Sequence, residues 1–518
     1  MAALVRGYAW SRTAVMFNDG PVFLSLAQAI GEGRWVEVLS HPYHPLYPLC
    51  IQWLSKSGLG LETSAVAISI SGGLLGIAAL HSFLRHAFGV EVAWLGAWIL
   101  ALHPWAVDFS SDVMSDGLYI GLYLSAFAAL ARMVETSSLP ASVCCGVLSA
   151  LAYLVRPEGV GLVLIGGVLL GWRVVAERSH RIAATRCLLA LGAAAGLVMA
   201  PYVIALSLSA GEITLSQKKS IASLAQGESS PTRPESESQS GTQRPPRAEI
   251  WLPQSSALAD GSGARRPSRD LAGVVEATSR VVRTAAAALR YEVLAFVLIG
   301  WFAIGRGGRR ARPWRTRTLV VPVILYQGLL VLLVWGAGYI SRRHALAMGL
   351  PLIGFAALGW NWLWARAAAN RLWRRAGEEG SVARTTSSRM AAVGLVVALA
   401  LVWGPRDLRT RRIERVAARQ AAEWLAERHP ESGPVAAQKL RTAYYAEAAY
   451  VPLPSGQDGG LERDLRRKGA RWVVIDQQGI GKHLGLAEGI DDWLDRVHSV
   501  RAEGRTALVF KVLPRPAS

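Results

Sequence analysis

The chain carries few charged residues for its length. Of 518 residues only 18% are charged, the mean hydropathy is +0.27, and the apolar residues gather in blocks. In a soluble globular protein about a quarter of the residues are charged. The composition therefore excludes an ordinary soluble protein and indicates a protein with many membrane-spanning segments.

Cysteine is also scarce, and no cleavable leader is visible. The four cysteines show no Cys-x-x-Cys pair and no Cys/His spacing typical of metal ligands. This argues against a disulfide framework and against a zinc site. The first twenty residues lack the apolar core of a signal peptide, so we expect no cleaved signal peptide.

The formal net charge of +19 could suggest a nucleic-acid partner. Many of the arginines, however, stand in short loops between apolar blocks, which is the distribution that the positive-inside rule produces. We therefore expect no nucleic-acid partner.

Apolar runs long enough to cross a membrane predict about ten helices. The predicted spans are 64–84, 87–104, 115–134, 139–155, 158–175, 187–209, 290–305, 318–340, 345–366 and 389–404. Three arginine-rich loops, at 173–186, 306–317 and 366–389, fall on one side of this arrangement, which we expect to be cytoplasmic. The basic run 406–415 falls on the other side; it has less weight, because late charges influence orientation less than early ones.

The spans divide the chain into five parts. We expect a first extracytoplasmic loop with interfacial helices, a first set of membrane helices, an extracytoplasmic loop, a second set of membrane helices and an extracytoplasmic α/β domain, at 1–63, 64–209, 210–289, 290–404 and 405–518. The third part begins with a Pro/Ser/Glu-rich stretch that predicts disorder, and it ends in a pattern typical of a helix lying at the membrane surface. In the last part, the pattern predicts a helix over 407–427 and strands over 471–476 and 506–512.

Acidic residues mark two places on the predicted outer side. Asp19 stands before a Gly-Pro pair, which on local pattern alone favours a helix cap. Asp108, Asp112 and Asp116 recur at every fourth position, so that on a helix they would share one face at the outer end of a span. Carboxylates in such a place can deprotonate an acceptor hydroxyl or hold a divalent cation, and Asp116 is the best single candidate.

Cationic residues reach the same side at three points. Arg156 lies beside Glu158 at a break between two predicted spans. A very short turn between two other spans carries Arg342, Arg343 and His344. Lys218 lies at the outer end of a further span. Single charges at helix ends often reach toward the membrane surface without any function. Their convergence with carboxylates suits a lipid phosphate as leaving group and a hydroxyl as nucleophile.

Four short motifs occur in order along the membrane region. They are an early external acid (Asp19) followed by His44–Pro48, a Ser-Asp-x-Leu start of a helix (115–118), an Arg-Pro-Glu-Gly break (156–159) and a Gly-Tyr-x-Ser-x-Arg-His turn (338–344). Together they resemble the polytopic GT-C glycosyltransferases of family 39. This group includes the protein mannosyltransferases, the aminoarabinose transferase of lipid A and lipopolysaccharide core transferases of the Rgt type.

The resemblance implies a mainly α-helical membrane bundle of the GT-C type with a small C-terminal α/β domain. It implies a polyprenyl-phosphate sugar as donor, a lipid, glycan or protein as acceptor, and transfer with inversion. It assigns Asp19 and Asp116 as catalytic acids, also the ligands of a divalent cation if one is needed. The donor phosphate would be bound by Arg156, Lys218, Arg342, Arg343 and His344, and the pocket would be shaped by His44, Tyr47, Glu158 and Tyr339.

The implied location is the inner (cytoplasmic) membrane, with the site facing the periplasm or the cell exterior. One departure from the family pattern concerns the segment before Asp19, which is too short and too charged to span a membrane, whereas family members carry a membrane helix there. We expect an upstream start site that would supply this helix.

The main alternative is a flippase or another transporter of lipid-linked saccharides, since such proteins also have many spans and ionisable residues among them. Transporters often contain internal repeats, and none is visible here. A lipid-oligosaccharide ligase would need a large loop rich in catalytic residues, which the Pro/Ser/Glu-rich stretch does not resemble.

Overall fold

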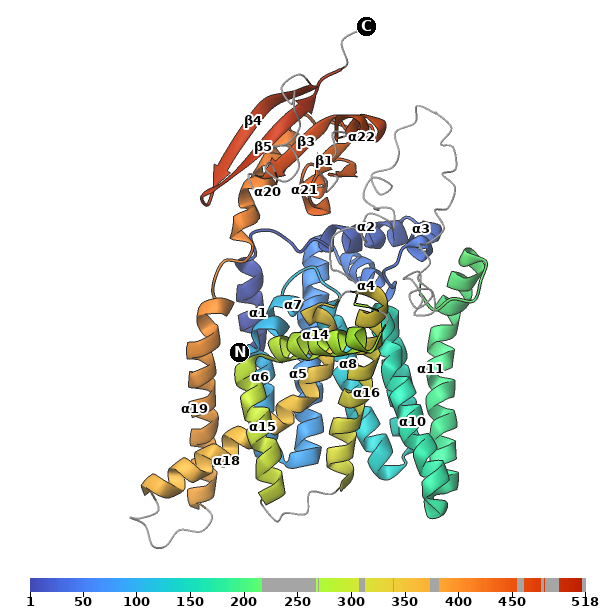
Figure 1. The fold of residues 1–518 in the computed structure, drawn as a ribbon, viewed down its shortest axis with the longest axis vertical. Coiled ribbons are helices and arrows are strands. Elements are labelled where there is room, and N and C mark those ends of the chain that lie inside the picture. Colours follow the sequence, from blue (N-terminus) through green and yellow to red (C-terminus); the bar gives the residue numbers. More distant parts are fainter. Residues whose placement is uncertain are drawn as a thin grey trace.

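A computed structural model describes residues 1–216, 267–268, 270–306, 313–338, 340–372, 382–453, 461–476, 479 and 493–514. Long helices form a bundle, and a small α/β domain from the end of the chain sits on one end of it (Figure 1). We call this end of the bundle the domain end. The fold class expected from the sequence, a helical membrane bundle with a small C-terminal α/β domain, is confirmed.

Four short helices precede the first long one. They are α1 (Ala2–Ser11), α2 (Gly20–Gly31), α3 (Trp35–Ser40) and α4 (Leu46–Ser55). The bundle helices are α5 (Leu61–Phe88), α6 (Val90–Leu102), α7 (Pro104–Ser110), α8 (Asp116–Thr136), α9 (Leu139–Val155), η1 (Pro157–Val160), α10 (Gly161–Ala176), η2 (Arg178–His180), α11 (Arg181–Ala210), α14 (Leu271–Leu289), α15 (Tyr291–Arg306), α16 (Pro313–Ala337), α17 (Arg342–Gly349), η3 (Leu350–Leu352), α18 (Ile353–Leu372) and α19 (Val382–Asp407).

Each of the ten predicted spans contains a helix. Among the described residues, six helical segments are long and apolar enough to cross a membrane, and two bent pairs, α6 with α7 and α14 with α15, raise the number to eight. The remaining two predicted spans correspond to the shorter apolar helices of 139–155 and 320–336. The chain is therefore an integral membrane protein. The predicted amphipathic helix is α14, which runs across the bundle near its domain end (Figure 1).

Glycines let α5 and α8 pack with their backbones in contact. Gly72 and Gly76 on α5 face Gly117 and Gly121 on α8, each pair four residues apart. A Cβ atom added to Gly117 would lie 2.3 Å from the carbonyl oxygen of Ser69, and one added to Gly121 would lie 2.4 Å from that of Gly72. Small residues at this spacing are a common way for membrane helices to approach closely. Because Asp116 begins α8, this contact also fixes the position of its carboxylate.

We expect Gly117→Val to destabilise the protein by about 1–3 kcal/mol, because a branched side chain would force α8 away from α5. The thermal unfolding of the detergent-purified variant measures this loss. Gly171→Ala is the matched control, since a Cβ atom there meets nothing within 4 Å. An unfolding temperature of Gly117→Val equal to that of the control would contradict the close contact.

The α/β domain contains a five-stranded sheet in the order β2-β1-β3-β5-β4. Its elements are η4 (Ile413–Arg415), α20 (Val416–Arg428), β1 (Val435–Ala437), α21 (Leu440–Tyr445), β2 (Tyr450–Pro452), α22 (Leu461–Arg467), β3 (Trp472–Asp476), β4 (Leu494–Ala502) and β5 (Arg505–Val512). β1 pairs in parallel with β2 and β3, while β5 is antiparallel to both β3 and β4. The two predicted strands are β3 and β5. The helix predicted over 407–427 is wrong at its start, because α19 continues to Asp407 and α20 begins only at Val416.

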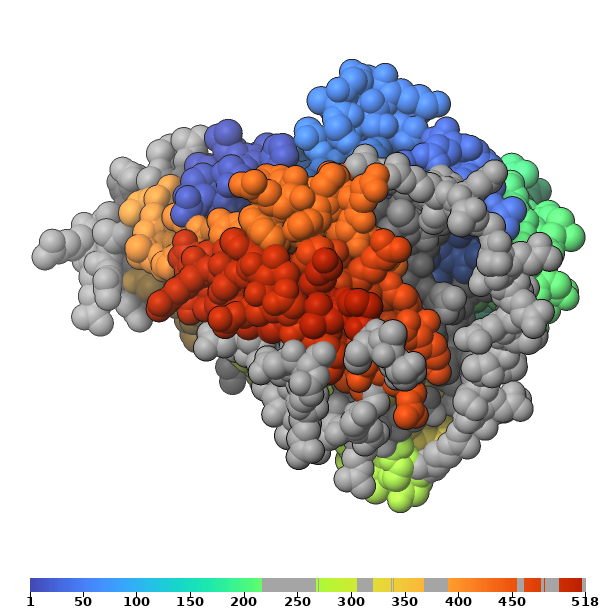
Figure 2. All heavy atoms as spheres, turned by 90° about the horizontal axis from the view of Figure 1, so that it is seen from above, coloured from blue at the N-terminus to red at the C-terminus, as the bar shows by residue number. Residues whose placement is uncertain are grey.

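Helix α2 lies between the bundle and the α/β domain. Phe23, Leu24 and Ala27 belong to the core of the bundle, whereas Val22 and Leu26 pack in a second cluster that includes residues of α21. The partners on α21 are Leu440 and Ala443. Viewed from above, the C-terminal residues cover the middle of this end of the molecule, with N-terminal residues beside them (Figure 2). Helix α2 is therefore packed against the bundle on one side and against α21 on the other.

The segment between α19 and α20 is held by acids near the end of α7. Arg411 lies 3.2 Å from a carboxylate oxygen of Asp108, and Arg412 forms an ion pair with Asp112. Arg411 also forms a β-bridge with Thr13. The basic run 406–415 was the one feature that disagreed with the predicted orientation. Two of its arginines are paired with carboxylates, those of Asp108 and Asp112.

The prediction that Asp108, Asp112 and Asp116 share one helical face is wrong. α7 ends at Ser110 and α8 begins at Asp116, so that Asp112 lies in the turn between them. Its carboxylate accepts hydrogen bonds from the backbone N–H groups of Val113 at 2.7 Å and Phe17 at 3.1 Å. A short acidic side chain that bonds to nearby backbone in this way competes with helix formation. Burial raises the pKa of Asp112, an effect that the Arg412 charge opposes.

Candidate active site

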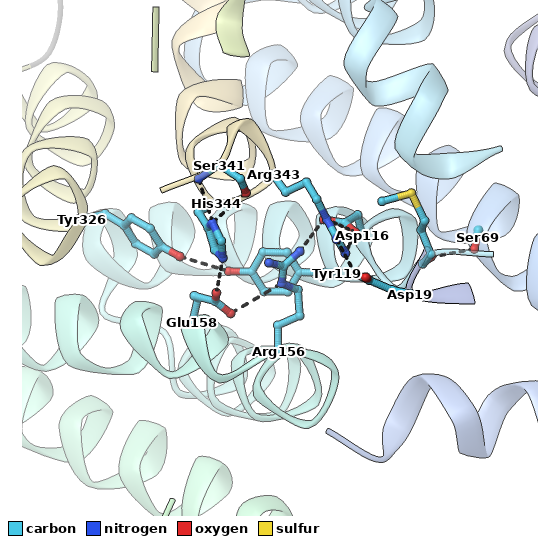
Figure 3. A network of polar contacts seen from close by, with 11 residues as sticks. Asp19, Ser69, Asp116, Tyr119, Arg156, Glu158, Tyr326, Ser341, Arg343 and His344 are labelled. Atoms are coloured by element: carbon cyan, nitrogen blue, oxygen red, sulfur yellow. Dashed lines mark hydrogen bonds and ion pairs between the residues drawn. The ribbon is translucent and has the colours of Figure 1, made fainter. Parts of the chain in front are cut away.

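Five charged side chains from four parts of the chain meet at the domain end of the bundle (Figure 3). Asp19 comes from the N-cap of α2, Asp116 from the first residue of α8, Arg343 from the first turn of α17, and Arg156 and Glu158 from the break between α9 and α10. We call this group the charged cluster. These residues are far apart in the sequence, so the bundle itself creates the cluster.

Arg343 joins the two acids. Its guanidinium donates to Oδ2 of Asp19 at 2.6 Å, and to Oδ2 of Asp116 at 2.6 Å and 3.0 Å. The ring of Phe17 lies 5.1 Å from the same guanidinium carbon. A planar guanidinium can bind two acceptors in fixed geometry, which a lysine could not do.

The two acids differ in exposure and in the number of arginines that they contact. The Asp116 side chain is only 2% exposed, and its second oxygen, Oδ1, forms an ion pair with Arg156. The Asp19 side chain is 17% exposed, and within the described residues no arginine contacts its Oδ1 atom. Asp116 is therefore engaged in holding two arginines, whereas Asp19, the more exposed of the two acids, contacts one arginine and the hydroxyl of Tyr43.

A second set of contacts extends from Arg156. Its Nε atom lies 3.5 Å from Glu158, and Nε2 of His344 lies 3.7 Å from the other oxygen of Glu158. The Ser341 backbone N–H donates to Nδ1 of His344 at 3.3 Å, which leaves the ring proton on Nε2, facing Glu158. Burial opposes the charge of Arg156, but the Asp116 and Glu158 carboxylates outweigh it and hold the pKa of Arg156 above its usual value.

Aromatic side chains that the sequence did not single out line the cluster. The Tyr119 ring lies 5.5 Å from the guanidinium carbon of Arg156, and its hydroxyl is 3.4 Å from that of Tyr326. Tyr43 lies near Asp19, and burial together with this carboxylate raises the pKa of Tyr43. Tyr119 and Tyr326 belong to apolar helices, where no local pattern distinguishes them from ordinary core residues.

The other residues expected at the site lie elsewhere or outside the described residues. His44 is buried against Tyr153 and Tyr202, with ring centroids 4.9 Å and 5.3 Å away. The Tyr47 hydroxyl is 2.8 Å from Ser69, whose own hydroxyl donates to the Met114 carbonyl two residues before Asp116. Arg342 points away from the cluster, toward Trp105. Lys218 and Tyr339 lie outside the described residues.

The charged cluster does not fit a divalent cation. Both oxygens of Asp116 and one of Asp19 are bound to guanidinium groups, whose positive charges would repel a metal ion. No group of three His, Cys, Asp or Glu side chains with metal-binding geometry occurs among the residues that the structure describes. A divalent cation held by Asp19 and Asp116 therefore disagrees with this donor set.

Comparison with known proteins gives a family match over part of the chain and a fold for nearly all of it. Residues 40–204 match the family model of dolichyl-phosphate-mannose-protein mannosyltransferases. No curated protein sequence matches the chain. The match covers the chain from the segment before α4 to α11 and so includes Asp116, Arg156 and Glu158.

Solved structures match almost the whole chain at low identity. ArnT from Cupriavidus metallidurans bound to undecaprenyl phosphate is 14% identical, with a TM-score of 0.56 over 98% of this chain and 96% of that one. The same protein in the apo state gives a TM-score of 0.58 at 15% identity, over the same shares. The archaeal oligosaccharyltransferase AglB from Archaeoglobus fulgidus, in complex with an inhibitory peptide and a dolichol-phosphate, is 12% identical, with a TM-score of 0.56 over 92% of this chain and 68% of that one.

These matches agree with the motifs in the sequence. The family model covers the first half of the bundle, and the solved structures cover both the bundle and the α/β domain. The resemblance drawn from the motifs is thereby confirmed: residues 40–204 match the family model of the protein mannosyltransferases, and the chain as a whole has the fold of ArnT and AglB.

Proposed function

We propose that this protein transfers a sugar from a polyprenyl-phosphate donor to a hydroxyl group of an acceptor, with inversion at the anomeric carbon. The observation that carries the proposal is the arrangement of Arg343 between Asp19 and Asp116, with Arg156 on the far side of Asp116. Two guanidinium groups and one partly exposed carboxylate suit a phosphate leaving group and a base. The complexes of ArnT with undecaprenyl phosphate and of AglB with dolichol-phosphate support this donor class.

In the proposed reaction Asp19 is the base. Its carboxylate takes the proton of the acceptor hydroxyl as the oxygen attacks the anomeric carbon of the donor. The bond between that carbon and the phosphate oxygen breaks, and the polyprenyl phosphate leaves with the bonding electrons. Attack on the face opposite the leaving group inverts the anomeric configuration.

The arginines stabilise the phosphate as its negative charge grows. Arg343 and Arg156 are already aligned by Asp116, so that little reorganisation is needed when the donor binds. A donor phosphate that binds Arg343 competes with Asp19 for the same guanidinium. In the proposed cycle, donor binding therefore loosens the Arg343–Asp19 contact and frees the base for the acceptor.

We infer that the site faces the outside of the cytoplasmic membrane. The arginines of the loop between α10 and α11 lie at the end of the bundle opposite the α/β domain (Figure 1). Basic loops of this kind remain in the cytoplasm. The domain end, with the charged cluster, then faces the periplasm or the cell exterior.

The proposal is tested by a transfer assay on detergent-purified protein with a panel of radiolabelled polyprenyl-phosphate sugars. Consumption of a donor together with labelling of an acceptor supports the proposal and identifies the sugar. Movement of the labelled lipid across a reconstituted bilayer without any transfer would replace it with a transporter function.

We expect Arg343→Ala to impair use of the donor more than use of the acceptor. The KM for the donor should rise, and kcat should fall by about a hundredfold or more, because a charge-assisted contact to the phosphate is lost. The measurement compares KM values for donor and acceptor in wild type and variant. Equal losses for both substrates would argue against contact between Arg343 and the donor phosphate.

A further inference from the structure

A tryptophan near the domain end lies against two arginines from distant parts of the chain. The guanidinium carbon of Arg342, on α17, is 4.6 Å from the centre of the Trp105 ring, and that of Arg406, on α19, is 4.1 Å from it. The Trp105 ring is fixed in place, because its Nε1–H donates to the carbonyl of Ala287 on α14 at 3.3 Å. We call Trp105, Arg342 and Arg406 the arginine clamp.

The two arginines of the clamp differ from their neighbours in having no carboxylate. Arg156, Arg343, Arg411 and Arg412 each form an ion pair, and so does Arg290, which is paired with Glu292 at 2.7 Å. Within the described part of the chain, neither Arg342 nor Arg406 forms a hydrogen bond or an ion pair with any acid, and the guanidinium group of each lies over the ring. Asp108 and Asp407 lie near Arg406, but Asp108 is already bound to Arg411, and the Asp407 carboxylate also faces Arg411 and Arg6.

Two like charges so close together favour a bound anion. Since both guanidinium carbons lie within 5 Å of one ring centre, they are less than about 9 Å apart, which is close to the Debye length at physiological salt. The Arg342 side chain is exposed, while those of Trp105 and Arg406 are partly exposed. An anion from outside the protein can therefore reach the clamp and offset the repulsion.

The position of the clamp identifies the class of anion. Arg342 begins one apolar segment long enough to span the membrane, and Arg406 lies in the last turn of another. α14 crosses the bundle beside them and exposes Leu271, Val275 and Val282 (Figure 1). Tryptophan and arginine at the ends of apolar helices are typical of the depth at which lipid headgroups lie.

We propose that the arginine clamp binds the phosphate group of a membrane lipid. The guanidinium groups donate to the phosphate oxygens from the faces of the Trp105 ring, and the lipid chains run along the apolar helices below. This site is separate from the charged cluster, because Arg342 points away from Arg343 and its two carboxylates. The proposal does not depend on sugar transfer.

The test is native mass spectrometry of the full chain in detergent, titrated with phosphatidylglycerol, undecaprenyl phosphate or phosphatidylcholine. Wild type should bind one copy of a lipid with an anionic phosphate more tightly than phosphatidylcholine. The double variant Arg342→Gln/Arg406→Gln should bind that copy at least about tenfold more weakly, since charge-assisted hydrogen bonds are lost. Arg409→Gln, which changes an exposed arginine of the same segment, should bind as wild type does.

The arms of the titration separate the sources of the phosphate. Equal binding of phosphatidylglycerol and undecaprenyl phosphate supports a site for lipid phosphates in general. A preference for undecaprenyl phosphate supports a carrier-lipid site at the clamp only if the double variant loses it, since binding at the charged cluster would persist in that variant. Inorganic phosphate that binds the clamp while neither lipid does would overturn the lipid assignment. Unchanged lipid binding in the double variant would overturn the proposal, and the two single variants provide the same comparison if the double variant unfolds.

Discussion

Asp19→Asn should abolish sugar transfer while leaving the fold intact. Loss of a general base lowers kcat by about a hundred- to ten-thousandfold. Asparagine has nearly the same shape, and Arg343 keeps its two contacts with Asp116, so the cluster should remain assembled. The measurement is donor turnover in the purified variant, with thermal unfolding recorded on the same sample.

Asp108→Asn provides the control for this result. Asp108 is also a carboxylate paired with an arginine at the domain end, but it contacts Arg411 and not the charged cluster. Its replacement should change turnover by no more than about twofold, because Asp108 contacts neither of the arginines proposed to bind the donor phosphate. If Asp19→Asn retained the turnover of this control, Asp19 would not be the base.

Asp116→Asn should reduce both stability and activity. Asp116 is 2% exposed and neutralises Arg156 and Arg343, which are themselves mostly buried. Removing one partner of a buried ion pair costs about 3–5 kcal/mol. In this variant the two arginines would keep only Asp19 and Glu158 as counterions. The unfolding temperature should therefore fall well below that of Asp19→Asn.

Thermal unfolding and turnover of the two variants, measured side by side, check this difference. The comparison separates a residue that positions arginines from a residue that takes a proton. An Asp116→Asn protein as stable as wild type would mean that its two arginines find other acceptors or that the site is more hydrated than its burial indicates.

The membrane helices and the β-strands could be predicted because their signals are local. A run of apolar residues predicts a span from its own composition, and the short runs of β-forming residues at 471–476 and 506–512 predict β3 and β5. The prediction from the spacing of Asp108, Asp112 and Asp116 was wrong because it also used only local sequence. That spacing places the three acids on one helical face only if no turn lies between them. The turn at Asp112 depends on Phe17 and Arg412, which are distant in the sequence.

For the charged cluster, the sequence predicted which residues take part but not which residues contact one another. Asp19, Asp116, Arg156 and Arg343 were all expected near one another, on the basis of span counting and resemblance. That Asp116 lies between two arginines is decided by the packing of α8, α9 and α17. Arg342 was expected at the donor phosphate, but its neighbour in space is Trp105, for which no pattern existed.

The packing of α2 between the bundle and the α/β domain limits which domains this protein could exchange with proteins of the same fold. Asp19 caps α2, and α2 is packed on one side by α21 of the α/β domain. A chimaera that receives the C-terminal domain of another protein with this fold would replace Leu440 and Ala443, and with them the surface against which Val22 and Leu26 rest. The two parts therefore have to change together in evolution, and exchange of the domain alone would displace the proposed base.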